Sequence, residues 1–235
     1  MNVLITGGSK GIGRELVLKF AEDVANNVVV FSRNQDQLKA LKQECLERFN
    51  NEIVYYSIDY LENDIEEKIK STLNQLDTHF HIVINNAGLL INKLFDDSTM
   101  KEWEDTFKVN SLVPMLIIKY TLKLNISTQN CHIVNIASMG GVQGSVKFPG
   151  LSAYSGSKAA LINLTECLAE ELKESNTMIN SLALGAVQTE MLQEAFPDYK
   201  ANINPKQMAN FIHQFSTSND GLLNGKVIPV SNSTP

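Results

Sequence analysis

Cysteine is scarce in this sequence, and long apolar runs are missing. The three cysteines, Cys45, Cys131 and Cys167, stand far apart among 235 residues and form no Cys-x-x-Cys pair. A sparse, odd set is typical of reduced thiols in a cytosolic protein, so we expect each to be a small core residue. No segment reaches the ~20 apolar residues of a membrane helix, and no signal peptide precedes the first predicted strand. We therefore expect a soluble, cytoplasmic protein without a membrane partner.

An excess of positive charge is also missing. The formal net charge is −6, and the Lys and Arg residues are scattered rather than clustered. Because nucleic acids and anionic membranes are bound by basic patches, the composition argues against both as partners. The four histidines lack the spacing of metal ligands, so we predict no metal site. The apolar share of 43% is ordinary for a globular chain, and the length suits one domain covering residues 1–235.

Short runs rich in Val and Ile alternate with longer amphipathic segments along the whole chain. The predicted strands are residues 3–5, 28–31, 53–56, 81–84, 132–136, 178–183 and 226–230. The predicted helices are residues 12–25, 36–49, 61–76, 101–124, with Pro114 as a candidate kink, 153–173 and 205–215. Most strands lack strict alternation, which indicates burial on both faces. The pattern predicts an α/β fold, a Rossmann-type doubly wound parallel sheet of about seven strands flanked by helices, with its ligand outside the carboxyl ends of the strands.

A glycine-rich turn joins the first predicted strand to the first helix. Thr6–Gly13 reads Thr-Gly-Gly-Ser-Lys-Gly-Ile-Gly. Glycines in this position let the backbone approach a pyrophosphate, which the helix N-terminus stabilises. The alternative is a plain structural turn, since glycine serves any tight turn. The spacing differs from that of a P-loop, and no Gly-Lys-Ser/Thr follows, so nucleotide hydrolysis is disfavoured.

The end of the second strand predicts which dinucleotide binds. An NAD-binding unit places Asp or Glu there, whereas this strand ends in Ser32 and Arg33. The Arg33 guanidinium suits a 2′-phosphate, and Lys10 in the glycine turn is a second cation for the same group. Both residues could instead be exposed surface cations. Together with the missing carboxylate they favour NADP(H).

Further motifs follow the later strands. Asn-Asn-Ala-Gly stands at residues 85–88, and Tyr154 and Lys158 have the spacing Tyr-x-x-x-Lys, a weak signal alone. Combined with the glycine turn, they make the sequence resemble the short-chain dehydrogenase/reductase family, in its compact single-domain branch, from Asn2 to about Val230. The resemblance implies an NADP(H)-dependent oxidoreductase that transfers a hydride between nicotinamide and a carbonyl or alcohol substrate. Its catalytic residues would be Asn110, Ser138, Tyr154 and Lys158.

The chemistry explains these residue types. Tyr154 and Lys158, at i and i+4, share one helix face, and a nearby ammonium is expected to lower the pKa of a phenol toward the working range. Tyr154 would donate its proton to the carbonyl oxygen, while Ser138 hydrogen-bonds the same oxygen. By resemblance, Lys158 also binds the nicotinamide ribose and Asn110 anchors a water-linked proton relay. A core-edge tyrosine and a packing amide are the alternatives for Tyr154 and Asn110.

The resemblance also implies a set of cofactor contacts. Asp59 would bind the adenine amine, Asn86 would form a wall on the adenosine side, and Thr189 would contact the carboxamide. Each of these three could instead be a local cap. The whole implied set is Thr6, Gly7, Ser9, Lys10, Gly11, Ile12, Gly13, Ser32, Arg33, Asp59, Asn86, Ala87, Gly88, Tyr154, Lys158, Gly185, Val187 and Thr189.

Some positions depart from the family pattern. Leu184 replaces the usual Pro before Gly185, and Met139 follows Ser138 where a small polar residue is common. Ser138 and Tyr154 are 16 positions apart, which predicts an enlarged loop at residues 147–150. The C-terminal residues 231–235 lack the usual Gly-Gly. Residues 188–204 are expected to form a mobile, rather apolar flap over the substrate.

Two helices, at 101–124 and 153–173, carry apolar residues around much of their circumference, including Leu161, Leu164 and Leu168. Such helices need a cover besides their own sheet. By resemblance they pair subunits, so we expect a homotetramer or homodimer. Two other functions stay open. The first is a catalytically silent cofactor sensor or scaffold. Such a protein would be expected to have lost the tyrosine or the lysine, and this chain retains both. The second is a sugar-nucleotide epimerase or dehydratase, although the glycine spacing and the length after the sixth strand argue against it.

Overall fold

Seven parallel strands form the centre of the molecule. The computed structural model describes residues 1–125, 129–218 and 221–231. Within them one sheet has the strand order β3-β2-β1-β4-β5-β6-β7, with every neighbouring pair parallel. The strands are β1 (Asn2–Thr6), β2 (Asn27–Ser32), β3 (Val54–Ser57), β4 (Ile82–Asn85), β5 (Cys131–Ser138), β6 (Thr177–Leu184) and β7 (Val227–Val230).

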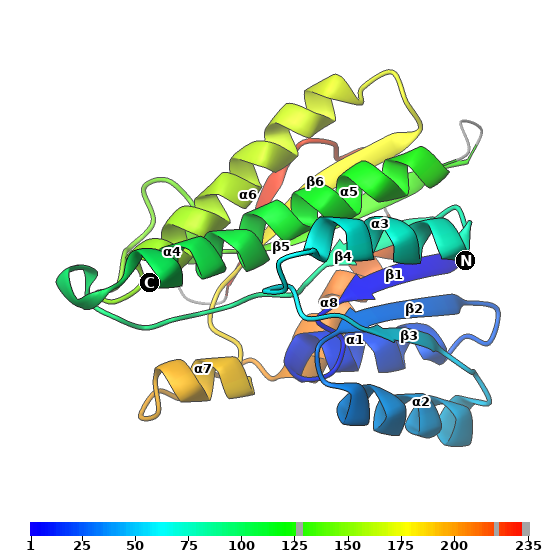
Figure 1. Cartoon of the computed structure of the whole chain (residues 1–235), viewed down its shortest axis with the longest axis horizontal. Helices are drawn as coiled ribbons and strands as arrows, with labels where there is room; N and C mark the ends of the chain where they lie inside the picture. Colours follow the sequence, from blue (N-terminus) through cyan, green and yellow to red (C-terminus); the bar gives the residue numbers. More distant parts are fainter. Residues whose placement is uncertain (126–128, 219–220, 232–235) are drawn as a thin grey trace.

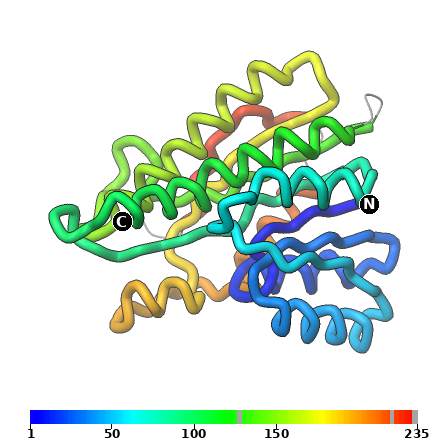
Figure 2. Tube along the Cα trace, in the orientation of Figure 1, coloured from blue at the N-terminus to red at the C-terminus, as the bar shows by residue number. Residues whose placement is uncertain are grey.

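Helices cover both faces of this sheet (Figure 1). One core contains α1, α2 and α8, and the other contains α3, α5 and α6. The helices are α1 (Gly11–Ala21), α2 (Gln35–Phe49), α3 (Ile65–Leu76), α4 (Met100–Phe107), α5 (Val113–Leu124), α6 (Ser152–Glu171), α7 (Glu190–Ala195) and α8 (Pro205–Thr217). The trace in Figure 2 shows α7 set apart from both layers, beyond the end of β6.

Burial on both faces explains why the strands lack alternation. In β1, Val3 and Ile5 lie in the core with α1, whereas Leu4 lies in the core with α3 and α5. All three are 0% exposed. The predicted doubly wound parallel sheet is confirmed, and each predicted strand is present with its ends shifted by at most two residues.

The predicted helix at 101–124 is divided. After α4 the chain makes a five-residue π-turn, Lys108–Leu112, and α5 then starts with Pro114 in its first turn. A proline lacks the N–H that an interior helix position would donate, and the wide turn places it where none is needed. The predicted helix at 12–25 ends early, at Ala21, because the Asp23 carboxylate accepts from the Ala25 N–H and turns the chain.

The cysteines are unpaired, and two of them are buried. Burial raises the pKa of the Cys45 and Cys131 thiols to about 11. The prediction was wrong for Cys167, which is exposed on the solvent side of α6. Hydrophobicity of the residue type alone does not say which face of a helix it occupies.

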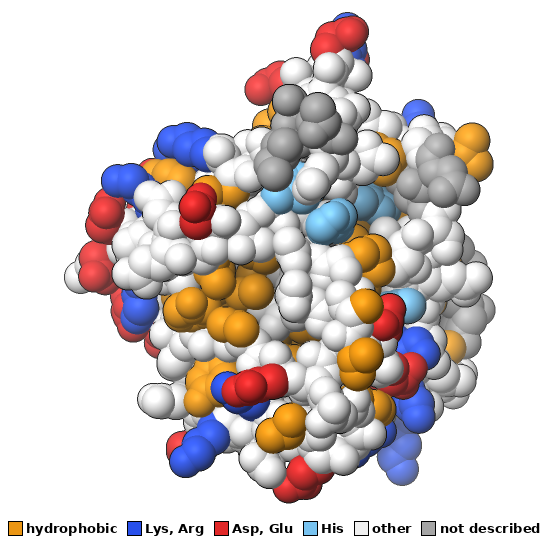
Figure 3. All heavy atoms as spheres, turned by 90° about the vertical axis from the view of Figure 1, so that its right-hand side faces the viewer, with side chains coloured by type: hydrophobic (Ala, Val, Ile, Leu, Met, Phe, Trp, Pro, Cys, Tyr) orange, Lys and Arg blue, Asp and Glu red, His pale blue; other side chains and the backbone are white. Residues whose placement is uncertain are grey.

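The histidines gather at the amino ends of the strands, the face shown in Figure 3. His81 Nδ1 accepts from the Asn2 amide at 3.0 Å, and the His79 and His81 ring centroids lie 5.0 Å apart. His132, at the start of β5, and His213, against Phe20, complete the four. Burial lowers the pKa of His81, His132 and His213, which favours their neutral form. These side chains serve packing on the edge opposite the carboxyl ends.

Within residues 1–125, 129–218 and 221–231, none of the helices combines the length and apolar composition that crossing a bilayer requires.

Candidate active site

A cleft of about 830 Å³ opens along the carboxyl ends of the strands. Its walls are the turns after β1 to β6, with parts of α6 and α7. It extends across β1 and β4, which are neighbours although β2 and β3 separate them in the chain. Ligands of open α/β sheets bind where the strand order reverses in this way. All the predicted site residues except Thr6 and Asn110 line this cleft, and these two are buried behind it.

The glycine turn between β1 and α1 is tightly built. Gly7 and Gly11 adopt left-handed φ angles of +70° and +55°. A Cβ added to Gly13 would lie only 2.2 Å from the Gly7 carbonyl oxygen, so the turn and the first turn of α1 pack without room for a side chain. The first turn of α1 carries no acidic side chain. Its free N–H groups can therefore bind an anion such as a pyrophosphate.

The Asn-Asn-Ala-Gly segment after β4 holds this turn in place. Asn86 Nδ2 donates to the Thr6 carbonyl at 3.0 Å and to the Gly7 carbonyl at 3.2 Å. The amides of Asn86 and Ala87 both donate to Thr6 Oγ1 at 3.1 Å. Thr6 thus supports the loop from behind, and Asn86 fixes the turn as well as lining the cleft.

The ends of β2 and β3 shape the far side of the glycine turn. Ser32 Oγ donates to Ser9 Oγ at 2.8 Å, and Arg33 lines the cleft beside them. Asp59 also lines the cleft, while its carboxylate accepts from the Leu61 N–H at 3.0 Å. Asp59 is therefore both a local cap and a lining residue of the cleft.

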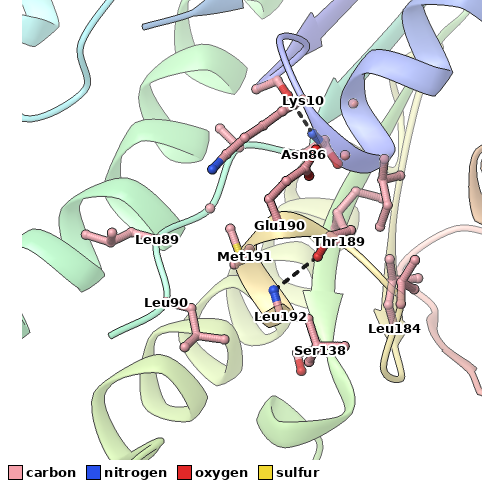
Figure 4. Close-up of a pocket in the computed structure, with 18 of the residues that line it drawn as sticks. Lys10, Asn86, Leu89, Leu90, Ser138, Leu184, Thr189, Glu190, Met191 and Leu192 are labelled. Carbon is pink, nitrogen blue, oxygen red and sulfur yellow. Dashed lines mark hydrogen bonds between the residues drawn. The ribbon is translucent and has the colours of Figure 1, made fainter. Parts of the chain in front are cut away.

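The Lys10 side chain reaches toward α7 and is also partly exposed to solvent. Its Nζ lies 3.7 Å from a carboxylate oxygen of Glu194, and both side chains are well exposed. Surface pairs of this kind contribute little to stability, so Lys10 can exchange this partner for a stronger anion. Figure 4 shows Lys10 and Glu190 approaching the same part of the cleft from the glycine turn and from α7.

Tyr154 and Lys158 both point into the cleft from the first turns of α6. Lys158 is 3% exposed, and its Nζ donates to the Ile136 carbonyl at 2.8 Å. Burial lowers the pKa of Lys158 to about 8. Burial also raises the pKa of the Tyr154 phenol, against the opposing effect of a hydrogen bond with Ser138.

The expected lowering of the Tyr154 pKa by Lys158 is therefore wrong for this arrangement. The Lys158 Nζ lies 5.9 Å from the centre of the Tyr154 ring, and desolvation of the phenol has the largest effect on its pKa, ahead of the hydrogen bond with Ser138. The phenol is protonated near neutral pH, which is the form that a proton donor needs.

Asn110 lies in the π-turn, one layer behind the cleft. Its Nδ2 donates to the Leu89 carbonyl and to Ser157 Oγ, both at 2.9 Å, and its Oδ1 accepts from the Leu89 amide at 2.8 Å. The π-turn, a feature frequent at functional sites, lets this one amide hold the segment after β4 against α6. Its place in a proton relay stays a prediction.

Sequence reasoning missed Ser157. Its Oγ accepts from Asn110 and donates to the Tyr154 carbonyl at 2.7 Å, so it joins two predicted catalytic residues. A signal was available: a serine three positions after Tyr154 on a helix reaches that carbonyl.

The start and the end of the 188–204 segment are held side by side by backbone hydrogen bonds. Val187 forms an isolated parallel bridge with Ile203, and the Gln188 amide donates to the Ile203 carbonyl at 2.8 Å. Between them Thr189 Oγ1 caps α7 by accepting from the Leu192 amide, as Figure 4 shows. Thr189 is therefore both a cap and a lining residue. A Cβ on Gly185 would lie 2.4 Å from Ser231 Oγ, so close packing against Ser231 requires glycine there.

The enlarged loop before Tyr154 meets the segment after β4 and the end of α7. Gly150 has φ +83° and its carbonyl accepts from the Lys93 amide at 2.9 Å. Asn92 Nδ2 donates to the Ala195 carbonyl at 2.8 Å. Asn92 joins segments distant in sequence, and no local pattern marks it. Of the predicted departures, the C-terminal one at residues 232–235 lies outside the described residues.

These residues fit a dinucleotide cofactor. Gly13 has no space for a side chain, α1 offers its free amides, and Ser32 with Arg33 occupies the end of β2.

The sequence profile of the family described as short chain dehydrogenase matches residues 1–200. The chain belongs to this family. It is a family of oxidoreductases, so the predicted resemblance is confirmed.

Curated relatives and solved structures support this membership. The chain is 29% identical over 238 residues to 3-oxoacyl-[acyl-carrier-protein] reductase FabG of Aquifex aeolicus, covering 97% of this chain and 94% of that protein. It is 31% identical over 199 residues to L-xylulose reductase of Caenorhabditis elegans, covering 83% and 75%.

Among solved structures, a short chain dehydrogenase of Shigella flexneri complexed with NADP matches with a TM-score of 0.87 at 22% identity, covering 97% of this chain and 95% of that one. Another fold neighbour, 4-hydroxyisoleucine dehydrogenase, is complexed with NADH. At these identities the structures show the short chain dehydrogenase fold.

Proposed function

We propose that this protein is an NADP(H)-dependent oxidoreductase that transfers a hydride between the nicotinamide and a carbonyl or alcohol substrate, as a ketoreductase does. One observation carries the proposal: Ser138, Tyr154 and Lys158 line the same cleft as the glycine turn and Arg33. An acid and an anion-binding turn in one cleft are what carbonyl reduction with a dinucleotide requires.

In the direction of reduction, a nicotinamide held in this cleft would supply the hydride to the carbonyl carbon. The Tyr154 phenol, which is protonated near neutral pH, donates its proton to the carbonyl oxygen. Ser138 Oγ hydrogen-bonds the same oxygen and orients the carbonyl. Lys158, positively charged below its pKa of about 8, stabilises the phenolate that remains and holds the ribose. Asn110, through its hydrogen bonds to Leu89 and Ser157, fixes the distance between the segment after β4 and α6.

The proposed preference for NADP(H) rests on the end of β2. Arg33, with Ser32 and Lys10 nearby, can pair with the 2′-phosphate through charge-assisted hydrogen bonds. The NADP complex of the Shigella flexneri relative supports this choice, whereas the NADH complex of 4-hydroxyisoleucine dehydrogenase shows that the fold serves both dinucleotides. The chemistry of Arg33 supports NADP(H) for this protein.

A cofactor sensor without turnover is the weaker candidate. It would need no acid in the cleft, yet Tyr154 and Lys158 are both present and directed into it.

We further propose that the protein is a cytoplasmic homo-oligomer, a tetramer or dimer, in which α4, α5 and α6 form subunit contacts. Exposed Met100 and Leu112 on this side of the molecule support it.

The test is NADPH oxidation by the purified protein with a panel of ketones and aldehydes. Turnover with at least one carbonyl compound, lost in Tyr154→Phe, is the expected result. NADPH binding without turnover of any carbonyl compound in the panel would favour the sensor.

A further inference from the structure

The end of the cleft beyond Ser138 and Tyr154 is apolar. Three segments build it: the turn after β4, the enlarged loop before α6, and the 188–204 segment. In Figure 4, Leu89, Leu90 and Met191 stand around the opening in front of Ser138. Side chains that line this end include Leu89, Leu90, Phe148, Met191, Leu192 and Phe196.

The described residues that line this end include no cation that could pair with a substrate anion. Among the lining residues that the structure describes, the cations are Lys10, Arg33 and Lys158. Lys10 belongs to the glycine turn, Arg33 follows β2, and Lys158 is buried against the Ile136 carbonyl. The carboxylates of Glu190 and Glu194 lie toward the glycine turn, where Glu190 faces Gly11 and Glu194 pairs with Lys10, so they bring no positive charge to the apolar end. A substrate carboxylate or phosphate would therefore be bound without a counter-charge, at a high cost in desolvation.

A substrate with many hydroxyl groups would also bind poorly at this end of the cleft. Beyond Ser138 and Tyr154, which face the reacting oxygen, the described side chains of this end offer few donors or acceptors, Tyr199 being one. A sugar would exchange its water contacts for leucine, methionine and phenylalanine side chains. An apolar chain gains free energy from the same surfaces, because they remove it from water.

The apolar surfaces are also held in place. The enlarged loop is tied to the turn after β4 by the Lys93–Gly150 hydrogen bond, and Asn92 ties that turn to the Ala195 carbonyl. Phe148 is nonetheless 48% exposed. A large side chain that is held at the mouth of a cleft and only half covered is suited to contact a bound apolar group.

We propose that the substrates are neutral carbonyl compounds with an apolar chain or ring on the carbonyl carbon, rather than sugars or small oxo acids. This inference rests on the proposed function. In the balanced reaction, the ketone carbon gains the hydride of NADPH and its oxygen gains the Tyr154 proton. The products are a secondary alcohol and NADP⁺, and the Tyr154 phenolate takes up a proton from solvent.

The experiment is a chain-length series of 2-alkanones, from 2-butanone to 2-nonanone, against L-xylulose and acetoacetate as polar and anionic probes. For the alkanones, kcat/KM is expected to rise by about fourfold for each methylene until the end of the cleft is filled. L-xylulose and acetoacetate should react at least 100-fold less efficiently than 2-octanone. Calorimetric binding of 2-alkanols to the NADP-loaded protein should show the same dependence on chain length.

Two variants locate the effect. Phe148→Ala and Phe196→Ala should each lower kcat/KM for 2-octanone by roughly tenfold and lower it less for 2-butanone, whose shorter chain has less apolar surface to bury against these rings. Phe211→Ala is the matched control: this ring is 40% exposed on α8, outside the cleft, and its loss should change neither substrate.

The outcomes separate the two proposals. Reduction of L-xylulose or acetoacetate at an efficiency equal to or above that of 2-octanone would overturn the apolar assignment and leave the oxidoreductase intact. A flat response to chain length would overturn it as well. Failure of every carbonyl compound to oxidise NADPH, with the cofactor bound, would instead overturn the proposed function.

Discussion

Asn92 donates a hydrogen bond of 2.8 Å to the main-chain carbonyl of Ala195, 103 positions later in the chain. This bond joins the turn after β4 to the end of α7. A Cβ added to Gly150 would lie 2.0 Å from Asn92 Oδ1, so glycine at 150 leaves the space that the Asn92 side chain occupies. One exposed amide therefore depends on the enlarged loop and holds the 188–204 segment over the cleft.

Asn92→Ala should loosen α7. One net hydrogen bond contributes about 1 kcal/mol, so the segment should open roughly fivefold more often. Hydrogen exchange of the Phe196 amide, which bonds to the Leu192 carbonyl, should accelerate by that factor. Gly150→Ala should act in the same direction because it displaces Asn92. Asn27→Ala, an exposed asparagine at the amino end of β2, is the control. Equal exchange in Asn92→Ala and the unaltered protein would show that the bond does not restrain α7.

Arg33→Asp should weaken NADPH binding by roughly 10- to 100-fold and NADH binding little, because the lost partner is the 2′-phosphate alone. Calorimetric Kd values for both cofactors check this. Arg48→Asp makes the same change of charge on the exposed side of α2 and should leave the ratio of the two Kd values unaltered. If the unaltered protein bound NADPH and NADH equally well, the assignment of Arg33 would be lost.

The sequence was sufficient for the sheet and for the chemistry at its carboxyl edge. Buried strands such as β5 produce apolar runs, and the turns after them are short, so residues such as Ser138 and Gly88 fall at the cleft without knowledge of packing. Local pattern and global position agree at these places.

Features that depend on contacts between distant segments were not predictable. The π-turn at Lys108–Leu112 has no periodicity of its own, and Asn92 meets Ala195 only after the fold has formed. The Tyr154 pKa followed the same rule: the pair Tyr154–Lys158 suggested charge attraction, whereas the depth of burial decided the direction. Cys167 lies on the outer face of α6, which its residue type does not reveal.

Lys158→Met should stabilise the fold while stopping turnover. Burial lowers the Lys158 pKa from 10.5 to about 8, so below pH 8 the folded chain bears the cost of a buried ammonium, on the order of 3 kcal/mol. Between pH 8 and 10.5 the unfolded chain binds more protons than the folded one, so stability rises with pH and the gain from Lys158→Met disappears. Urea unfolding of both proteins at pH 7 and pH 10.5 measures this. An equal difference at both pH values would contradict it.

Light scattering at micromolar concentration should give the mass of a dimer or tetramer. Leu112, 52% exposed at the junction of the π-turn and α5, is expected in the subunit contact, so Leu112→Glu should shift the mass toward the monomer. Val24→Glu, at a 64% exposed position in the turn between α1 and β2, should not. A monomeric mass of the unaltered protein would refute the proposed assembly.

Tyr154→Phe should abolish turnover and leave NADPH affinity nearly intact, because the hydroxyl acts only at the reacting oxygen and its effect is felt mainly in the transition state. Ser138→Ala should lower kcat by roughly 10²–10³ with little change in cofactor Kd, since loss of one good donor to that oxygen has this effect. Lys158→Ala should both slow turnover and weaken cofactor binding, because the ammonium serves the phenolate and the ribose. Single-turnover NADPH oxidation, paired with fluorescence titration of NADPH, separates the two effects. A folded, cofactor-loaded Tyr154→Phe protein that reduced its substrate at near the unaltered rate would show that another group delivers the proton.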